Sequence, residues 1–129
     1  MSTHSGSIIV SPGANIWPHE LKTAQALAAH GYIVRFIRKS EIDRETSADV
    51  IIDNLQWEIK SPTSSSLRAL DRNVRKALHQ SSNVIVDSFR IKQIPDHAIE
   101  RELRKLAREL RSLKRLLFVS RHRDVIDIK

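Results

Sequence analysis

Three residues in one short segment, Asp49, Glu58 and Lys60, have the types and spacing needed to bind a metal ion and act on a phosphate ester. Two neighbouring carboxylates repel unless a shared proton or a cation neutralises them, and hard divalent ions such as Mg²⁺ or Mn²⁺ take carboxylate and carbonyl oxygens. Such an ion polarises the phosphoryl oxygen and lowers the pKa of a bound water. The lysine ammonium can orient or deprotonate that water, or stabilise charge on the phosphate. This is phosphodiester hydrolysis, and it requires the three side chains to share one face.

The segment from residue 48 to residue 60 has the pattern of a β-hairpin. Asp53 and Asn54 tolerate the left-handed backbone of a two-residue turn, and that turn fixes a register in which Asp49 lies opposite Glu58. Directly opposed residues have Cβ atoms about 5 Å apart. Alternation predicts an apolar core face, made of Val50, Ile52, Leu55, Trp57 and Ile59, and an opposite face, made of Asp49, Ile51, Gln56, Glu58 and Lys60.

The hairpin also offers a third metal ligand, because the backbone carbonyl of Ile59 lies between Glu58 and Lys60 in the sequence. The alternative interpretation is an ordinary half-exposed hairpin, whose acid pair is bridged by the lysine and contributes little to stability. Asp53 is a further acid nearby, and the register makes it a turn residue.

The rest of the chain has the pattern of an alternating α/β domain. Helices are expected from Trp17 or Pro18 to His30, from Leu67 to Gln80, and from Asp96 to about Leu113. Strands are expected at Tyr32–Arg38, in the hairpin, and at Val84–Asp87, Leu116–Ser120 and Val125–Ile128. This order predicts an α/β fold with a mixed central β-sheet flanked by helices.

Length and composition indicate one domain over residues 1–129, with the polar residues 1–7 expected to be disordered. Apolar residues make up 40% of the chain and charged residues 29%, as in ordinary globular proteins. The absence of cysteine excludes disulfides, a thiol nucleophile and a sulfur-based zinc site. The sequence has no apolar run long enough to cross a membrane and no signal-peptide pattern, which favours a soluble protein.

The chain is strongly basic, with 22 Lys and Arg residues against 15 Asp and Glu residues and a net charge of +7. Such a charge attracts nucleic acid, although an acidic protein partner or simple solubility would also account for it. Spacings of three and four residues place a basic stripe on one face of the helix after the hairpin. The stripe consists of Arg68, Arg72, Arg75 and Lys76, as a candidate nucleic-acid contact or a solvated helix face.

Other patterns are weaker. A metal-independent ribonuclease would use histidine as acid and base, but no histidine pair has a spacing that forces convergence. His79, one turn after Arg75, is the histidine expected nearest the site. The cluster Arg121-His122-Arg123 is recommended for nucleic-acid binding by its charge alone. Aromatic residues are few, at 5%, which argues against a single-strand binder built on stacking.

The spacing of the hairpin residues resembles the PD-(D/E)xK nuclease superfamily, since Asp49 is followed nine residues later by Glu58-Ile59-Lys60. Ala48 stands where the superfamily pattern has proline. The wider segment Ala-Asp-Val-Ile-Ile-Asp-Asn-Leu-Gln-Trp-Glu-Ile-Lys-Ser-Pro-Thr, with the Ser-rich loop and basic helix after it, resembles the C-terminal nuclease domains of CdiA-type contact-dependent inhibition toxins. The resemblance covers residues 18–120 and implies a restriction-endonuclease-like core.

The resemblance also implies roles for individual residues. Asp49 and Glu58 would be metal ligands and Lys60 the catalytic lysine. Glu20 would be the first-helix acid near the active site, although an acid there also favours the positive helix end. Gln80 would support the site from the second helix, or it is an ordinary helix-end residue. Two hydroxyl residues after the lysine would contact a phosphate, or only shape the loop; they are Ser61 and Thr63.

These observations favour a Mg²⁺- or Mn²⁺-dependent endonuclease, with Zn²⁺ as a further metal, acting as a toxin domain on tRNA. Two alternatives stay open: a DNA endonuclease with the same site, and a nucleic-acid-binding module with a degenerate site. The toxin hypothesis implies a cognate acidic immunity protein over the basic cleft. It also implies action in the bacterial cytoplasm, in a target cell that receives the domain as part of a larger secreted effector. The sequence leaves the oligomeric state open.

Overall fold

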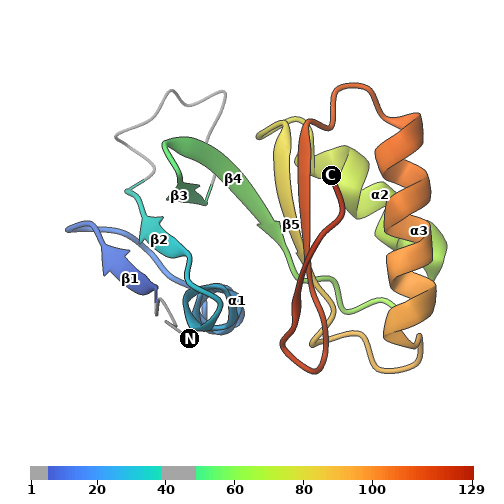
Figure 1. Cartoon of the computed structure of the whole chain (residues 1–129), viewed down its shortest axis with the longest axis horizontal. Helices are drawn as coiled ribbons and strands as arrows, with labels where there is room; N and C mark the ends of the chain where they lie inside the picture. Colours follow the sequence, from blue (N-terminus) through green and yellow to red (C-terminus); the bar gives the residue numbers. More distant parts are fainter. Residues whose placement is uncertain (1–5, 39–48) are drawn as a thin grey trace.

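The computed structural model describes residues 6–38 and 49–129 (Figure 1). Within these ranges the chain forms one sheet of seven strands and three helices, which confirms an α/β fold with a mixed sheet. The strands are β1 (Ser7–Val10), β2 (Ile33–Phe36), β3 (Val50–Ile52), β4 (Leu55–Lys60), β5 (Asn83–Asp87), β6 (Arg115–Val119) and β7 (Val125–Asp127). The helices are α1 (Pro18–Ala29), α2 (Leu67–Ala77) and α3 (Asp96–Glu109).

The order of strands in the sheet follows their order in the chain, from β1 at one edge to β7 at the other. Three neighbouring pairs are parallel, namely β1–β2, β4–β5 and β5–β6, and each is joined through one helix. Parallel strands need such a crossover, whereas the antiparallel pairs β3–β4 and β6–β7 are joined by short turns.

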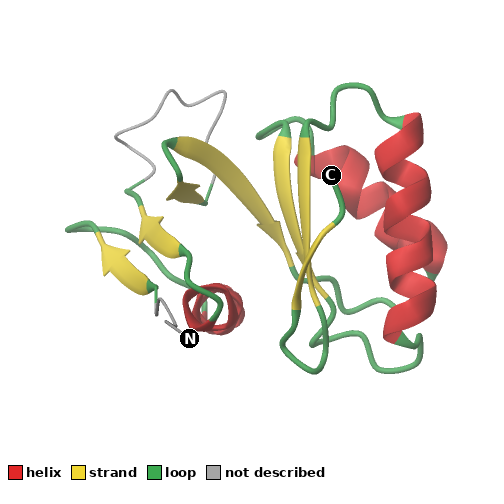
Figure 2. Ribbon diagram, viewed as in Figure 1, coloured by secondary structure: helices red, strands yellow, loops and turns green. Residues whose placement is uncertain are grey.

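The helices lie on both faces of the central strands, as Figures 1 and 2 show. Helix α1 lies between the β1–β3 part of the sheet and the β5–β7 part, while α2 and α3 cover the opposite face of β5 and β6. Strand β5 is buried on both faces: Ile85 belongs to the apolar cluster around α1, and Val84 and Val86 belong to the cluster under α2 and α3. The flanked sheet predicted from the sequence is thus confirmed.

The β3–β4 hairpin has the predicted turn. Asp53 and Asn54 both adopt positive φ, at 53° and 64°, and the register pairs Ile52 with Leu55 and Val50 with Trp57. These are the angles of a two-residue turn whose twist matches the strands. The core face is also as predicted, because Val50, Ile52, Trp57 and Ile59 are buried in the α1 cluster.

Two helices end earlier than the sequence predicts. Helix α2 stops at Ala77, so Gln80 lies in the following turn, and α3 stops at Glu109. The Lys129 ammonium donates to the carbonyls of Ala107 and Leu110 and so caps the last turn of α3, as cations at helix ends do. Leu113 is fully buried, but it lies in the turn after α3.

The disordered start predicted for residues 1–7 is wrong for its last two residues, and residues 1–5 lie outside the described ranges. The Gly6 N–H donates to Ala28 O at 2.8 Å, and Ser7 begins β1, which the sequence analysis missed. The signal for this strand was the apolar run Ile8–Val10. Across residues 6–38 and 49–129, no helix combines the length and apolar character needed to cross a bilayer.

Candidate active site

Asp49 lies directly before β3 and is tied to β4 in two ways. Its N–H donates to Trp57 O at 3.0 Å, and its Oδ2 accepts the Ile59 N–H at 2.9 Å. The strand pairs therefore stop at Val50–Trp57, and Asp49 is shifted by one residue from the predicted position opposite Glu58. A one-residue shift of this kind is how a β-bulge redirects a side chain. The bond from the Ile59 N–H fixes the Asp49 carboxylate at the start of β3, beside β4.

Glu58 and Lys60 project from β4 on the same face, next to Val84 and Val86 of β5. Glu58 is only 8% exposed, its Oε2 lies 3.5 Å from Lys60 Nζ, and its Oε1 has no hydrogen-bond partner. The sequence predicted the shared face but not the burial. A buried carboxylate oxygen without a donor is costly unless a cation or a proton reaches it.

The environment of Glu58 favours its protonated form. Burial raises the pKa of Glu58 to about 7, and the neighbouring Asp49 carboxylate acts in the same direction. The Lys60 ammonium opposes both effects but does not overcome them. Without a metal, the Glu58 carboxyl therefore keeps its proton up to near neutral pH. A divalent cation would supply the positive charge that lets both carboxylates ionise.

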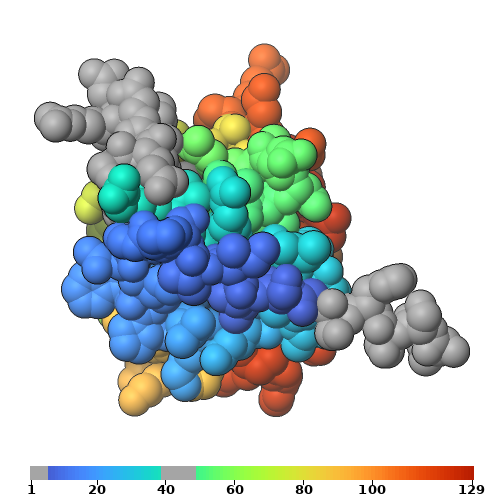
Figure 3. Space-filling model, turned by 90° about the vertical axis from the view of Figure 1, so that its left-hand side faces the viewer, coloured from blue at the N-terminus to red at the C-terminus, as the bar shows by residue number. Residues whose placement is uncertain are grey.

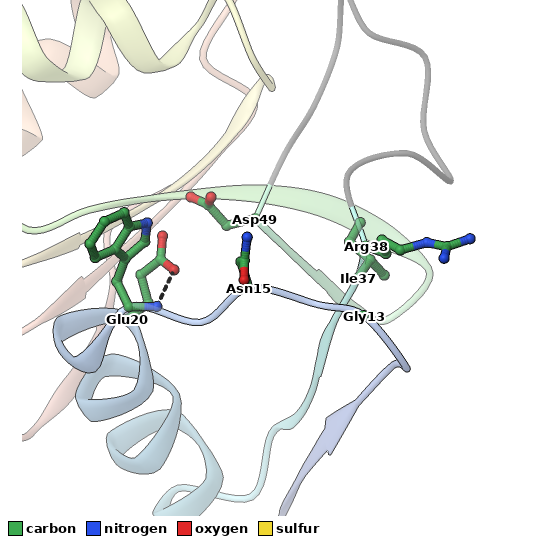
Figure 4. A pocket seen from close by; sticks show the side chains of 7 residues that line it. Gly13, Asn15, Glu20, Ile37, Arg38 and Asp49 are labelled. Carbon is green, nitrogen blue, oxygen red and sulfur yellow. Dashed lines mark hydrogen bonds between the residues drawn. The ribbon is translucent and has the colours of Figure 1, made fainter.

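A cavity of about 280 Å³ opens beside Asp49, and Glu20 of α1 lies on its wall (Figure 4). Asp49, Glu20 and Asn15 come together in this view, whereas Arg38 points away from them. Glu20 is 8% exposed, and its Oε1 accepts the Trp17 N–H at 3.2 Å. Glu20 thus caps the start of α1 and shares the cavity wall with Asp49, and its role in an active site stays a prediction. The cavity is lined by Gly13, Asn15, Trp17, Glu20, Ile37, Arg38 and Asp49.

His19 is a neighbour of this site that the sequence analysis missed. Burial and the Arg90 guanidinium lower its pKa, while the carboxylates of Asp49 and Asp87 act in the opposite direction. The His19 ring therefore feels the charges of both Asp49 and Arg90. The sequence signal was its position in the first turn of α1, next to Glu20. His79, the histidine predicted to be nearest, instead lines a hollow on α2.

The other predicted residues surround this centre without meeting in it. Gln80 is half-buried, and its N–H donates to Ala77 O at 2.9 Å. Ser61 is half-buried and Thr63 exposed, both in the loop between β4 and α2, whose Ser66 caps α2 by accepting the Ala69 N–H. None of these residues has a position in the structure that tests its predicted role.

The basic stripe of α2 is exposed and faces away from the sheet, because the opposite side of the helix is buried. Arg72, Arg75 and Lys76 line a shallow hollow of about 380 Å³ together with Asn73 and His79, while Arg75 also pairs with Asp71. Arg68 is exposed on the same helix but does not line the hollow. The stripe therefore offers a cationic surface outside the cavity that Asp49 lines.

In the cluster Arg121-His122-Arg123, the two arginines bind groups within the protein, unlike the nucleic-acid contact that their charge alone suggested. Arg121 donates to the carbonyls of Ile91 and Ile94. Arg123 donates to both carboxylate oxygens of the buried Asp87, each at 2.9 Å. These two arginines hold the fold together, so their charge is largely committed within the protein.

The described side chains fit a divalent cation in part. In residues 6–38 and 49–129, no group of three or more His, Asp and Glu side chains could hold a metal by itself. The donor set is instead two carboxylates, one with an orphaned buried oxygen. That set suits Mg²⁺ or Mn²⁺, which keep several waters and bind through one or two carboxylates plus substrate phosphate. The Ile59 carbonyl stays a predicted ligand.

The raised pKa of Glu58 has a consequence for stability. A carboxyl whose folded-state pKa exceeds its unfolded value of 4.5 stabilises the folded form at low pH, and that contribution is lost as pH rises toward 7. One pKa unit corresponds to about 1.4 kcal/mol, so the loss in metal-free protein is about 3 kcal/mol. We expect Glu58→Gln to raise the Tm of metal-free protein by several degrees at pH 8 and by little at pH 4.5.

Thermal unfolding in EDTA at the two pH values measures this difference. The control is Glu109→Gln, at an exposed position in the last turn of α3, which should change Tm by less than a degree or two at either pH. With Mg²⁺ added at pH 8, the wild-type Tm should rise and the Glu58→Gln Tm should not. An equal Tm for wild type and Glu58→Gln in EDTA at pH 8 would contradict the raised pKa.

Comparisons of the sequence and of the fold with known proteins identify the family of this chain. A sequence profile described as the contact-dependent growth inhibition CdiA C-terminal domain matches residues 46–125. Among solved structures, a chain of the "CdiA-CT/CdiI toxin and immunity complex from Burkholderia pseudomallei" has a TM-score of 0.73 and 20% sequence identity. That match covers 96% of this chain and 99% of the other, and it shows a shared fold. The comparison with curated proteins gives no match. Because the matched region includes the whole β3–β4 hairpin and more than half of the chain, this protein belongs to the CdiA C-terminal toxin domain family.

Proposed function

We propose that this domain is a metal-dependent endonuclease of the PD-(D/E)xK type, a contact-dependent inhibition toxin that cleaves tRNA in the target cell. One observation carries the proposal: the buried Glu58 oxygen without a hydrogen-bond donor, beside Lys60 at 3.5 Å and close to Asp49. A structural ion pair would satisfy that oxygen, whereas a cation-binding carboxylate leaves it available.

Each residue of the site has a distinct task in this mechanism. Asp49 and Glu58 would hold the cation, and the Ile59 N–H orients Asp49 by donating to its Oδ2. A bound divalent ion supplies Lewis-acid polarisation of the scissile phosphate and a lowered pKa for an attacking water. Lys60 orients the nucleophilic water and stabilises charge on the phosphate. Glu20 faces Asp49 across the cavity and anchors α1 through the Trp17 N–H.

The charge of the chain supports a polyanionic substrate and an acidic partner. With a net charge of +7 and the exposed arginines of α2, the surface attracts phosphate backbones. A toxin must be inhibited in the cell that makes it, and the positive charge of this chain suits an acidic partner. We therefore propose an acidic immunity protein as its partner. This proposal draws on the solved relative, whose structure is described as a toxin and immunity complex.

Cleavage of total tRNA and of plasmid DNA, side by side in Mg²⁺, Mn²⁺, Zn²⁺ or EDTA, tests the proposed function. We expect tRNA fragments with Mg²⁺ or Mn²⁺ and none in EDTA. Cutting of plasmid alone would make the domain a DNA endonuclease with the same site. Binding of either nucleic acid without cutting under any metal would contradict the enzyme and leave a nucleic-acid-binding module.

A further inference from the structure

The two tryptophans of the chain lie in opposite environments. Trp57 is 5% exposed and its Nε1–H donates to Ile52 O, so it is a core residue. Trp17 is 64% exposed, although it is the largest apolar side chain that folding could bury. Core packing does not explain this exposed indole, and it lies on the wall of the cavity with Glu20 and Asp49.

The backbone around Trp17 is held on every side. Its N–H donates to Glu20 Oε1 at 3.2 Å, and its carbonyl accepts the N–H groups of Glu20 and Leu21, each at 3.0 Å. Pro18 follows directly as the first residue of α1 and fixes the backbone there. The indole stacks on the His19 ring, with centroids 6.5 Å apart and an interplanar angle of 19°. The ring is therefore presented on a rigid support, with its outer surface open to solvent.

The position of this ring suits a nucleotide whose phosphate lies at the candidate metal site. Asp49, one of the two proposed metal ligands, shares the cavity wall with Trp17, so a phosphate bound through a cation at Asp49 would place the attached nucleoside beside the indole. The start of α1 directs its positive end toward the same place.

We infer that Trp17 is a stacking platform for an unpaired nucleobase next to the scissile phosphate, and that the domain therefore acts on single-stranded or splayed nucleotides. This inference rests on the proposed function and deepens it. A base inside a duplex is covered on both faces by its neighbours and cannot stack on a protein ring unless it leaves the helix. A loop of a folded RNA presents such a base, whereas intact duplex DNA does not.

The test measures binding separately from cleavage. The Lys60→Ala protein, in Mg²⁺, is titrated into a single-stranded RNA oligonucleotide that carries 2-aminopurine, and into a blunt duplex of the same sequence. Trp17→Ala and Trp17→Phe are introduced into this background. The matched control is Ile33→Ala, which removes a 57% exposed apolar side chain on β2 outside the cavity lining.

Loss of one base–aromatic stack weakens binding by about tenfold to a hundredfold. We expect that loss for Trp17→Ala with the single strand, together with loss of 2-aminopurine quenching. Trp17→Phe should stay within a few-fold of the parent protein because its ring still stacks, and Ile33→Ala should match the parent. Equal affinity of Trp17→Ala and the parent for the single strand would overturn the inference, and so would an equal loss on the duplex.

Cleavage by proteins with Lys60 intact separates this inference from the proposed function. If wild type cuts tRNA and Trp17→Ala cuts it at the same rate, the platform is overturned and the nuclease stands. If wild type cuts no substrate, and the single strand still shows 2-aminopurine quenching that depends on Trp17, the nuclease is overturned. Trp17 then stands as a base-binding site.

Discussion

Lys60→Ala should lower the rate of metal-dependent tRNA cleavage by about a hundredfold to ten-thousandfold, the range for removing a group that transfers a proton or stabilises transition-state charge. Lys60 Nζ lies 3.5 Å from Glu58 Oε2, and its side chain is 24% exposed, so it reaches both the carboxylates and solvent. The measurement is single-turnover cleavage of tRNA at saturating Mg²⁺. Lys114→Ala is the matched control, since Lys114 is an exposed lysine in the turn before β6.

Asp49→Ala should abolish cleavage to a similar extent, but through a different step. Removing Asp49 takes away a metal ligand and frees the Ile59 N–H that it accepts. Calorimetric titration of Mn²⁺ should therefore show binding by Lys60→Ala and none by Asp49→Ala. Cleavage by Lys60→Ala at the rate of Lys114→Ala would remove the lysine from the mechanism.

Arg123→Ala should destabilise the domain by about 3 to 5 kcal/mol, the cost of leaving a buried charge without its partner. Asp87 is 1% exposed and accepts two bonds from Arg123, one from the Thr23 hydroxyl at 2.6 Å and one from the Phe89 N–H at 2.8 Å. The Arg123 guanidinium also donates to Lys22 O and lies over the Phe89 ring. Urea unfolding at pH 7 measures the loss as a lower midpoint at constant m.

A surface ion pair provides the comparison for this effect. Arg104 pairs with Glu100 on the exposed face of α3 at 2.8 Å, and Arg104→Ala should cost less than about 1 kcal/mol. A loss for Arg123→Ala no larger than that for Arg104→Ala would contradict a structural role for the Asp87 pair. Because Thr23 and Lys22 belong to α1, the pair also holds the helix that carries Glu20 and Trp17, so Arg123→Ala should lower activity below the unfolding transition.

The hairpin was predictable because its signals are local. Asp53 and Asn54 fix the turn, the turn fixes the register, and alternation fixes the face of every following side chain. The same register argument gives the wrong partner for Asp49, which lies one residue beyond the last pair of β3 and β4 and is shifted relative to β4. Alternation also could not reveal that Glu58 is buried, because that burial comes from β5 and from elements distant in the sequence.

Other features depend on distant contacts and were missed or misplaced. Strand β1 has four residues and little buried surface, so its only signal was a short apolar run beside Pro12 and Gly13. His19 nears Asp49 only because α1 packs between two parts of the sheet. As an apolar residue, Leu113 suggested a longer α3. It is buried by tertiary packing and does not belong to the helix. The membership of Arg123 in a buried pair was likewise invisible to a charge count.

The strand order of the sheet has a consequence for how the chain regains its fold. Among the seven described strands, none has to insert between two that are already paired, because each joins the free edge left by the one before it. The β3–β4 and β6–β7 hairpins close short loops at a small cost in entropy, whereas each parallel pair closes a longer loop that contains a helix. Figure 3 shows the face of the molecule at the β1 end of this series, where the blue and cyan N-terminal part of the chain lies at the surface. Pairing in chain order completes the β3–β4 hairpin before β5, β6 and β7 join the sheet.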